Sequence, residues 1–211
     1  CMNKTERMKA VFENREPDRV PAGFWFHYPG EMPAEERAQA HVDLCRKTGA
    51  DIIKVMDDNF GRFFTQGIQI TKPSDWRKIR LPGKDCAHYR GMTELIGRIL
   101  EKAGGEAMVF PTVWSPFKIA SFTYLCAGGT DQQFMAHCRE DPDSVLEGVK
   151  ILADTLQTWT RDYLELGSSG IYYSGQFSEP QRFDGETWEK LVKPSDLAVL
   201  GVTKEFAEKY N

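Results

Sequence analysis

The regular alternation of strand-like and helix-like segments is the feature that most constrains the fold of this chain of 211 residues. Apolar runs that suit β-strands start near residues 20, 51, 106 and 169. Each run is followed by a stretch with helix-forming character or the apolar spacing of an amphipathic helix. Strands that alternate with helices pair in parallel and are joined by helical crossovers, so the sequence predicts an α/β fold.

Local signals mark several helix boundaries. Gly49 follows a run of strong helix formers, and Ser115 followed by Pro116 is typical of an N-cap and a first helical residue. The last segment, residues 184–210, predicts two helices separated at Pro194. Residues 63–83 predict an excursion with a hairpin or extended segments.

Two apolar segments lie near the start of the chain. Residues 4–13 predict a short amphipathic helix whose apolar face carries Met8, Val11 and Phe12. The next segment, after a turn with two prolines, predicts a strand whose side chains pack in the core, namely Phe24, Trp25 and Phe26.

Polar side chains follow each predicted strand at its carboxyl end. They are His27 and Tyr28, Asp57 and Asp58, Trp114 and Ser115, and Ser174 and Gln176. Side chains that converge from several strand ends form the active sites of (β/α)8 barrels. No glycine-rich phosphate loop follows the first strand, as a dinucleotide-binding doubly wound sheet would require. The pattern therefore predicts a (β/α)8 TIM barrel.

The predicted barrel is only partly present. Four strands make half of such a barrel, and the whole domain usually needs about 250 residues. We therefore expect residues 1–211 to be a single domain that holds the N-terminal part of the barrel and is truncated at its C-terminus. A sheet edge left open by truncation would favour a homo-oligomer, because unpaired strand edges invite association.

Composition excludes several classes of partner. The formal net charge is −4 and the basic residues are scattered, which argues against nucleic acid as the main partner. No apolar run approaches the roughly 18 residues that would cross a bilayer, so no membrane partner is expected. The cysteines form no CxxC pair, which favours reduced thiols in the cytoplasm.

Four segments, in order, resemble the uroporphyrinogen decarboxylase family. "TERMKAVFENREPDRVP" is similar to the family's opening helix and "PDRxP" turn. "SPFKIASFTYLCAGG" resembles its segment in which a proline starts a helix whose tyrosine precedes a Gly-Gly pair. "GSSGIYYSGQ" and "FDGETWEKLVKPSDLAVL" are similar to its fourth strand and the helical stretch after it. The resemblance implies the same (β/α)8 barrel.

The resemblance also implies roles for particular residues. The family contains cofactor-free decarboxylases of tetrapyrrole side chains and corrinoid-linked methyltransferases that activate a thiol with zinc. The acid that faces the pyrrole NH groups in the decarboxylases falls on Asp57 or Asp58. The tyrosine before the Gly-Gly pair falls on Tyr124, and the small polar residue after the fourth strand falls on Ser174. We therefore expect Asp57, Asp58 and Tyr124 to be catalytic.

One departure from the family distinguishes between its two activities. The decarboxylases carry an arginine-rich "RQAGR" loop after the first strand, whereas this chain reads "FHYPGE" there. Arginine binds carboxylates in a planar bidentate manner that His27 and Tyr28 cannot replace. The missing arginines favour methyl transfer over decarboxylation. The family's zinc ligands would lie beyond residue 211, so we expect no metal or cofactor within this chain.

Each candidate residue has a plainer interpretation beside the functional one. Imidazole and phenol at a strand end can bind or protonate a substrate, but His27 and Tyr28 could equally be rim packing. Ser174 and Gln176 share one face of their strand and are expected to bind substrate. Tyr124 has the spacing of a core residue. His137 and Cys138 are adjacent on a helix and point apart, which favours packing over metal binding.

Three functions remain open. The first is a family barrel that acts on a tetrapyrrole- or corrinoid-linked substrate, with methyl transfer favoured and a corrinoid protein as a partner. The second is an authentic uroporphyrinogen decarboxylase with a rearranged carboxylate clamp. The third is a non-catalytic binding module.

Overall fold

The computed structural model describes residues 1–58, 68–80, 83–176 and 182–210, which form a mixed α/β fold. A three-stranded sheet has the order β1-β2-β3, where the strands are Ile52–Val55, Met108–Trp114 and Tyr172–Ser174. The α-helices are α1 Lys4–Phe12, α2 Ala34–Thr48, α3 Ala87–Ala103, α4 Pro116–Cys126, α5 Asp131–Glu140, α6 Pro142–Glu165, α7 Gly185–Thr187 and α8 Lys193–Tyr210. Two shorter elements are the 3-10 helix η2 (Pro73–Lys78) and the π-helical turn η3 (Trp188–Val192).

The first two strands pair in parallel, as the sequence predicts. Ile52 lies opposite Met108, and the register continues to Val55 opposite Pro111. The helix α3 lies between them in the chain and supplies the crossover that parallel pairing needs. This small sheet is consistent with part of an α/β barrel.

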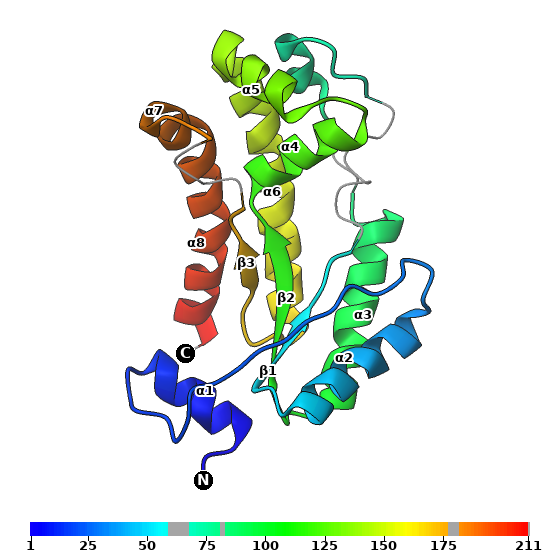
Figure 1. Cartoon of the computed structure of the whole chain (residues 1–211), viewed down its shortest axis with the longest axis vertical. Coiled ribbons are helices and arrows are strands. Elements are labelled where there is room, and N and C mark those ends of the chain that lie inside the picture. Colours follow the sequence, from blue (N-terminus) through cyan, green and yellow to red (C-terminus); the bar gives the residue numbers. More distant parts are fainter. Residues whose placement is uncertain (59–67, 81–82, 177–181, 211) are drawn as a thin grey trace. The chain divides into compact units, whose positions relative to one another are not determined.

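One compact unit comprises residues 1–58, 89–112 and 162–172. Within it α2 lies against β1 and beside α3, as Figure 1 shows. Glu35 of α2 binds Arg98 and Lys102 of α3, with N–O distances of 2.7 and 2.5 Å. Such exposed ion pairs contribute little, so the buried side chains of Val42, Ile53 and Ile96 account for most of the packing energy here.

The other compact unit comprises residues 59–88, 113–161 and 173–211. Its core includes Trp76, Phe117 and Phe134, all fully buried. The ring of Phe134 lies 5.4 Å from that of Trp76 and 5.2 Å from that of Phe117, which are distances of favourable aromatic pairs. The helix α4 contacts α5, η3 and α8 within this unit.

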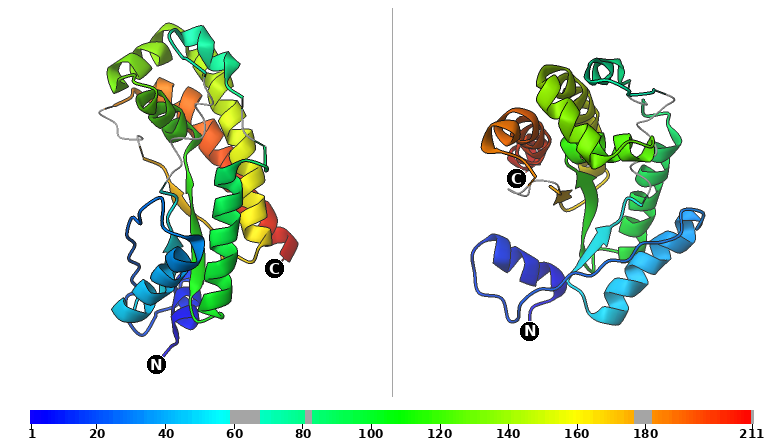
Figure 2. Two further views of the ribbon diagram at one scale, coloured as in Figure 1. Left: turned by 90° about the vertical axis from the view of Figure 1, so that its right-hand side faces the viewer. Right: turned by 45° about the horizontal axis from the view of Figure 1, so that its top comes forward.

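The predicted break at Pro194 is wrong. Residues 185–210 form one helical run, drawn in orange to red in Figure 2, and Pro194 lies in the first turn of α8. The π turn before it is the reason, because there the backbone N–H of Lys193 bonds to Trp188 instead of to the residue four positions back. Such a widened turn accommodates a proline without ending the helix.

The apolar face predicted for α1 is also wrong. The helix forms, but it buries Arg7 and Ala10, while Val11 and Phe12 are 39% and 60% exposed. Arg7 is turned inward because its guanidinium donates to Asp18 and to Asp51, each at 2.6 Å. The "PDR" turn therefore joins α1 to the start of β1 through ion pairs rather than through apolar contact.

The aromatic strand predicted from residue 20 does not form. Residues 20–29 have no regular secondary structure, and the side chains predicted to lie in the core are exposed at 51%, 45% and 62% for Phe24, Trp25 and Phe26. The segment does run against β1, because Asp51 N–H donates to the Ala22 carbonyl at 2.7 Å. A side chain at Gly23 would lie only 2.8 Å from the Ile52 side chain, so a larger residue there would force Ile52 to shift.

The predicted excursion is partly described. Residues 73–78 form η2, a 3-10 helix rather than a hairpin, with Pro73 at its first position. Residues 63–67 and 81–82 of that prediction lie outside the described residues. In the described part of the chain, every helix is too short or too polar to cross a lipid bilayer.

Candidate functional site

The carboxyl end of β1 brings His27 and Asp58 together. His27 Nδ1 and Asp58 Oδ1 are 2.6 Å apart, and the backbone N–H of Tyr28 donates to Asp58 Oδ2 at 3.3 Å. In a neutral imidazole, a carboxylate partner selects the tautomer with the proton on Nδ1, which leaves the lone pair on Nε2. Three of the residues expected to form a site at this strand end therefore lie in contact.

The two partners differ in exposure. The Asp58 side chain is 7% exposed, whereas that of His27 is 74% exposed. A buried carboxylate thus orients an imidazole whose other nitrogen faces a ligand or solvent. A nucleophile-activating base is arranged in this way in many enzymes, with the carboxylate fixing the tautomer. The neighbouring Asp57 is also buried, at 7% exposed.

His41 of α2 supports this end of the strand. Its Nδ1–H donates to the Arg37 carbonyl at 2.8 Å, and its Nε2 accepts from the backbone N–H of Met56 at 3.4 Å. Burial lowers the pKa of His41, which keeps the ring neutral and able to accept that bond. The ring of Tyr28 packs on His41 at 4.7 Å, so His41 holds both Met56 and Tyr28 in place.

Burial also affects Tyr28. Its half-buried phenol has a raised pKa, mainly because burial disfavours the phenolate and secondarily because Asp58 and Asp43 are negative. Tyr28 therefore acts as a neutral hydrogen-bond donor or as a stacking surface at neutral pH. That suits the substrate-binding role predicted for it, which remains a prediction.

The compact unit that contains α4 holds a second polar cluster, which the sequence did not predict. The Tyr173 hydroxyl donates to Asp196 Oδ1 at 2.6 Å, and the Ser115 side chain also hydrogen-bonds to Asp196. Burial raises the pKa of Asp196 above 3.8, and burial together with Asp196 raises that of Tyr173. Ser115 is the N-cap of α4, as predicted, and its N–H donates to the Ser174 carbonyl at 3.0 Å.

The sequence shows that Asp196 lies near the start of a helix, but it does not show that this acid is buried against Tyr173. It lies in the first turn of α8, where an acid is ordinarily an exposed helix-capping residue. Its contact with Tyr173 joins residues far apart in the chain, and no local pattern predicts such a contact.

The remaining predicted residues have plainer surroundings. Tyr124 is 6% exposed and packs on Trp76 and His137, at centroid distances of 6.1 and 5.2 Å. A side chain at Gly129 would collide with the Tyr124 ring at 2.2 Å, which explains a glycine after this tyrosine. Ser174 is half-buried and Gln176 is exposed. Their predicted roles remain predictions.

His137 is buried and packs in the core beside Trp76. Its Nδ1 accepts from Trp76 Nε1–H at 3.2 Å in the core, and Cys138 beside it is buried. Among the described residues, no group of three or more His, Cys, Asp and Glu side chains is placed to hold a metal ion.

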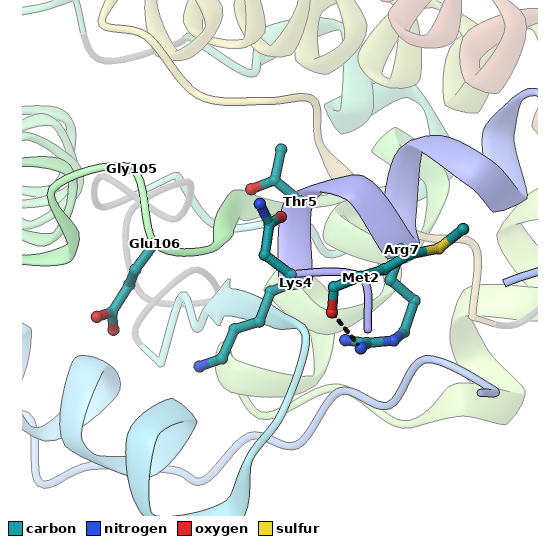
Figure 3. A pocket seen from close by; sticks show the side chains of 7 residues that line it. Met2, Lys4, Thr5, Arg7, Gly105 and Glu106 are labelled. Atoms are coloured by element: carbon teal, nitrogen blue, oxygen red, sulfur yellow. Dashed lines mark hydrogen bonds between the residues drawn. The ribbon is translucent and has the colours of Figure 1, made fainter. Parts of the chain in front are cut away.

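An open pocket of about 580 Å³ lies elsewhere in the unit that contains α1 (Figure 3). It is lined by Met2, Asn3, Lys4, Thr5, Arg7, Gly105 and Glu106. Arg7 donates to the Met2 carbonyl at 2.6 Å, and its other nitrogens bind Asp18 and Asp51. Its charge is thus already compensated, and the pocket shares no residue with the His27–Asp58 pair.

Comparisons with known proteins bear on the fold. No family model matches the chain, and no curated protein matches it in sequence. Among solved structures, a methyltransferase from Methanosarcina mazei is similar over 96% of this chain and 68% of its own, with a TM-score of 0.75 and 14% identity. At that identity the similarity shows a shared fold, which is the fold of a protein described as a methyltransferase.

Proposed function

We propose that this chain belongs to the uroporphyrinogen decarboxylase family and takes part in methyl transfer, with a corrinoid- or tetrapyrrole-linked substrate. The observation that carries the proposal is the His27–Asp58 pair, at 2.6 Å, in the segment where the family's decarboxylases carry arginines. Similarity in fold to a protein described as a methyltransferase supports the same choice.

The pair can perform the proton transfer that methyl transfer to a thiol requires. Asp58 holds His27 with Nδ1–H directed at the carboxylate, so Nε2 is the atom that accepts the thiol proton. The resulting thiolate attacks the methyl carbon, a carbon–sulfur bond forms, and the cobalt–carbon bond of a methylated corrinoid breaks with its electron pair left on cobalt. The proton leaves from Nε2 to solvent, since the His27 side chain is 74% exposed.

Decarboxylation of a polycarboxylate needs more than this pair. Binding several carboxylates calls for bidentate guanidinium groups, and the loop from Phe24 to Glu31 contains none. His27 offers one N–H at most to an anion once Nδ1 is directed at Asp58. The segment therefore supports proton transfer better than a carboxylate clamp.

The experiment compares methyl transfer by the parent chain and two variants. The chain is incubated with methylcobalamin and 2-mercaptoethanol, and loss of the cobalt–carbon bond is followed by absorbance. We expect Asp58→Asn to slow transfer by about 100-fold, because general base catalysis typically contributes 10²- to 10⁴-fold. Asp154→Asn, an exposed acid on α6, is the matched control and should transfer as the parent does.

Three other outcomes are informative. Transfer by Asp58→Asn at the parent rate would remove the pair from the mechanism. Decarboxylation of uroporphyrinogen by the parent chain would establish the second function instead. A chain that neither transfers nor decarboxylates, but binds cobalamin, would be a binding module.

A further inference from the structure

The first strand, β1, carries a buried lysine. Lys54 is 6% exposed and lies opposite Phe110 of β2, between the buried apolar residues Ile53 and Val55. Lysine is almost never this buried unless its ammonium group is paired with an anion. The strand thus places a cation where an apolar residue would ordinarily pack.

Two aromatic rings cover the ammonium group. Lys54 Nζ lies 3.8 Å from the ring centroid of Trp25 and 3.8 Å from that of Tyr172. The two rings are 6.0 Å apart and inclined at 49°, so Nζ sits in the angle between them. Cation–π attraction of this kind favours the charged amine, more so where water is excluded.

No anion among the described residues completes the site. In residues 1–58, 68–80, 83–176 and 182–210, no carboxylate lies within 4.0 Å of Lys54 Nζ, and the groups that contact it are the two rings. Burial alone lowers the pKa of Lys54 to about 8, and no neighbouring charge of either sign contributes. The amine is therefore mainly cationic at neutral pH and has N–H donors left for an acceptor.

We propose that Lys54 binds the carboxylate of a planar aromatic ligand whose ring stacks on Trp25 and Tyr172. The aromatic side chains suit this role because each is part-exposed, at 45% and 36%, and so presents ring surface to a ligand. Trp25 belongs to the irregular segment of residues 20–29, so its ring can be displaced from Nζ without opening a strand ladder. This site shares no residue with the His27–Asp58 pair and does not depend on methyl transfer.

A matched pair of small ligands tests the role of the charge. The probes are 2-naphthoate and its neutral amide 2-naphthamide, whose binding is followed by naphthyl fluorescence with no methyl donor present. In the parent chain we expect 2-naphthoate to bind about tenfold more tightly, because a hydrogen bond to a charged group contributes about that factor. Lys54→Gln should remove the preference, whereas Lys47→Gln, an exposed lysine of α2, should retain it.

The dependence of binding on pH provides a second test that needs no variant. Tyr172 is the only other titratable side chain in contact with Nζ among the described residues. Raising the pH through about 8 neutralises Lys54, so binding of 2-naphthoate should weaken while binding of 2-naphthamide stays constant. Tyr172→Phe keeps the ring and should leave this pH dependence unchanged.

Two results would overturn the proposal. Equal affinity of the parent chain for the two probes at pH 7 would show that the ammonium group does not select an anion. Retention of the tenfold preference by a folded Lys54→Gln variant would assign the anion to another residue. If Lys54→Gln does not fold, the comparison of probes and the pH titration on the parent chain still decide.

Discussion

An aspartate lies at each end of β1, and the two carboxylates differ in how many hydrogen bonds they accept. Asp51, just before the strand, is fully buried and accepts from Arg7, from two nitrogens of Arg19 and from the backbone N–H of Ala22, at 2.6 to 2.9 Å. Asp58, after the strand, accepts from His27 and from the Tyr28 backbone. The Asp51 carboxylate is surrounded by its donors, whereas the Asp58 carboxylate orients the exposed imidazole of His27.

This difference separates stability from chemistry along one strand. In (β/α)8 barrels, residues at the amino ends of strands serve stability and those at the carboxyl ends serve catalysis. The four donors around Asp51 leave no lone pair for a ligand, so substitution should lower stability and leave ligand binding unaffected. A carboxylate such as Asp58 holds a second group, so substitution should leave the fold and remove an activity.

The largest expected effect is on the free energy of unfolding. Asp51→Asn should lower it by about 3 kcal/mol, because a buried positive group loses its charged partner. Asp58→Asn should lower it by less than about 1 kcal/mol, because its main partner is exposed and can turn to water. Urea unfolding of both variants measures the difference. Equal losses would mean that the two ends of β1 are not distinct.

The second largest effect is the loss of stability in acid, which should come from the amino end of β1 and not from its carboxyl end. Hydrogen bonds from Arg7 and from the Met2 backbone lower the pKa of Asp18 from 3.8 to about 2. Burial would raise the pKa of Asp51, but the bonds from Ala22, Arg19 and Arg7 outweigh it and the pKa falls below 3.8. Since both folded pKa values lie below the unfolded value, the stabilisation is present above about pH 4 and is lost as the pH falls further.

A comparison of variants can assign this acid sensitivity to the ion pairs of Arg7 with Asp18 and Asp51. Unfolding midpoints in urea at about pH 5 and about pH 2.5 should fall steeply in the parent chain and less in Asp51→Asn, where one carboxylate is already absent. The Asp58→Asn variant should keep the steep fall of the parent. A parent-like fall in Asp51→Asn would place the acid-sensitive group elsewhere.

The smallest expected effect on stability is at His27. His27→Gln should change the free energy of unfolding by no more than about 0.5 kcal/mol, because the side chain is 74% exposed, glutamine can still donate to Asp58, and surface substitutions are usually within that range. The same variant should lose methyl transfer, since an amide can still donate to Asp58 but cannot accept a proton from a thiol. A loss above 1 kcal/mol in urea would make His27 a structural residue.

Local signals in the sequence predicted helix ends well and the burial of side chains poorly. Gly49 ends α2 with φ of 68°, and Ser115 caps α4, because caps depend only on neighbouring residues. Phe24 and Phe26 were expected in the core and are exposed, since hydrophobicity drives burial only where another layer covers the side chain. Arg7 lies outside the apolar face predicted for its helix, and its distant partners Asp18 and Asp51 bring it inside.

In the candidate site, too, some features could be predicted from the sequence and others depend on distant residues. His27 and Asp58 were both expected at strand ends on one side of the sheet, and they do meet although residues 20–29 form an irregular segment instead of a strand. Lys54 and Asp196 could not be predicted, because each acquires its significance from residues far away in the chain. Within "DIIKVMDD" the lysine interrupts an apolar strand, and that interruption was the one available signal that the strand buries a cation.

The register of the sheet has a consequence for the order in which the chain can fold. The links from Arg7 and Arg19 to Asp51 join residues within the first quarter of the sequence, so they can close early during synthesis. The ladder that pairs Ile52 with Met108 must wait until twice as much chain has been made. During that interval β1 lacks its partner β2 and Lys54 lacks the Tyr172 ring, so the nascent chain passes through a stage in which this strand can pair with wrong partners.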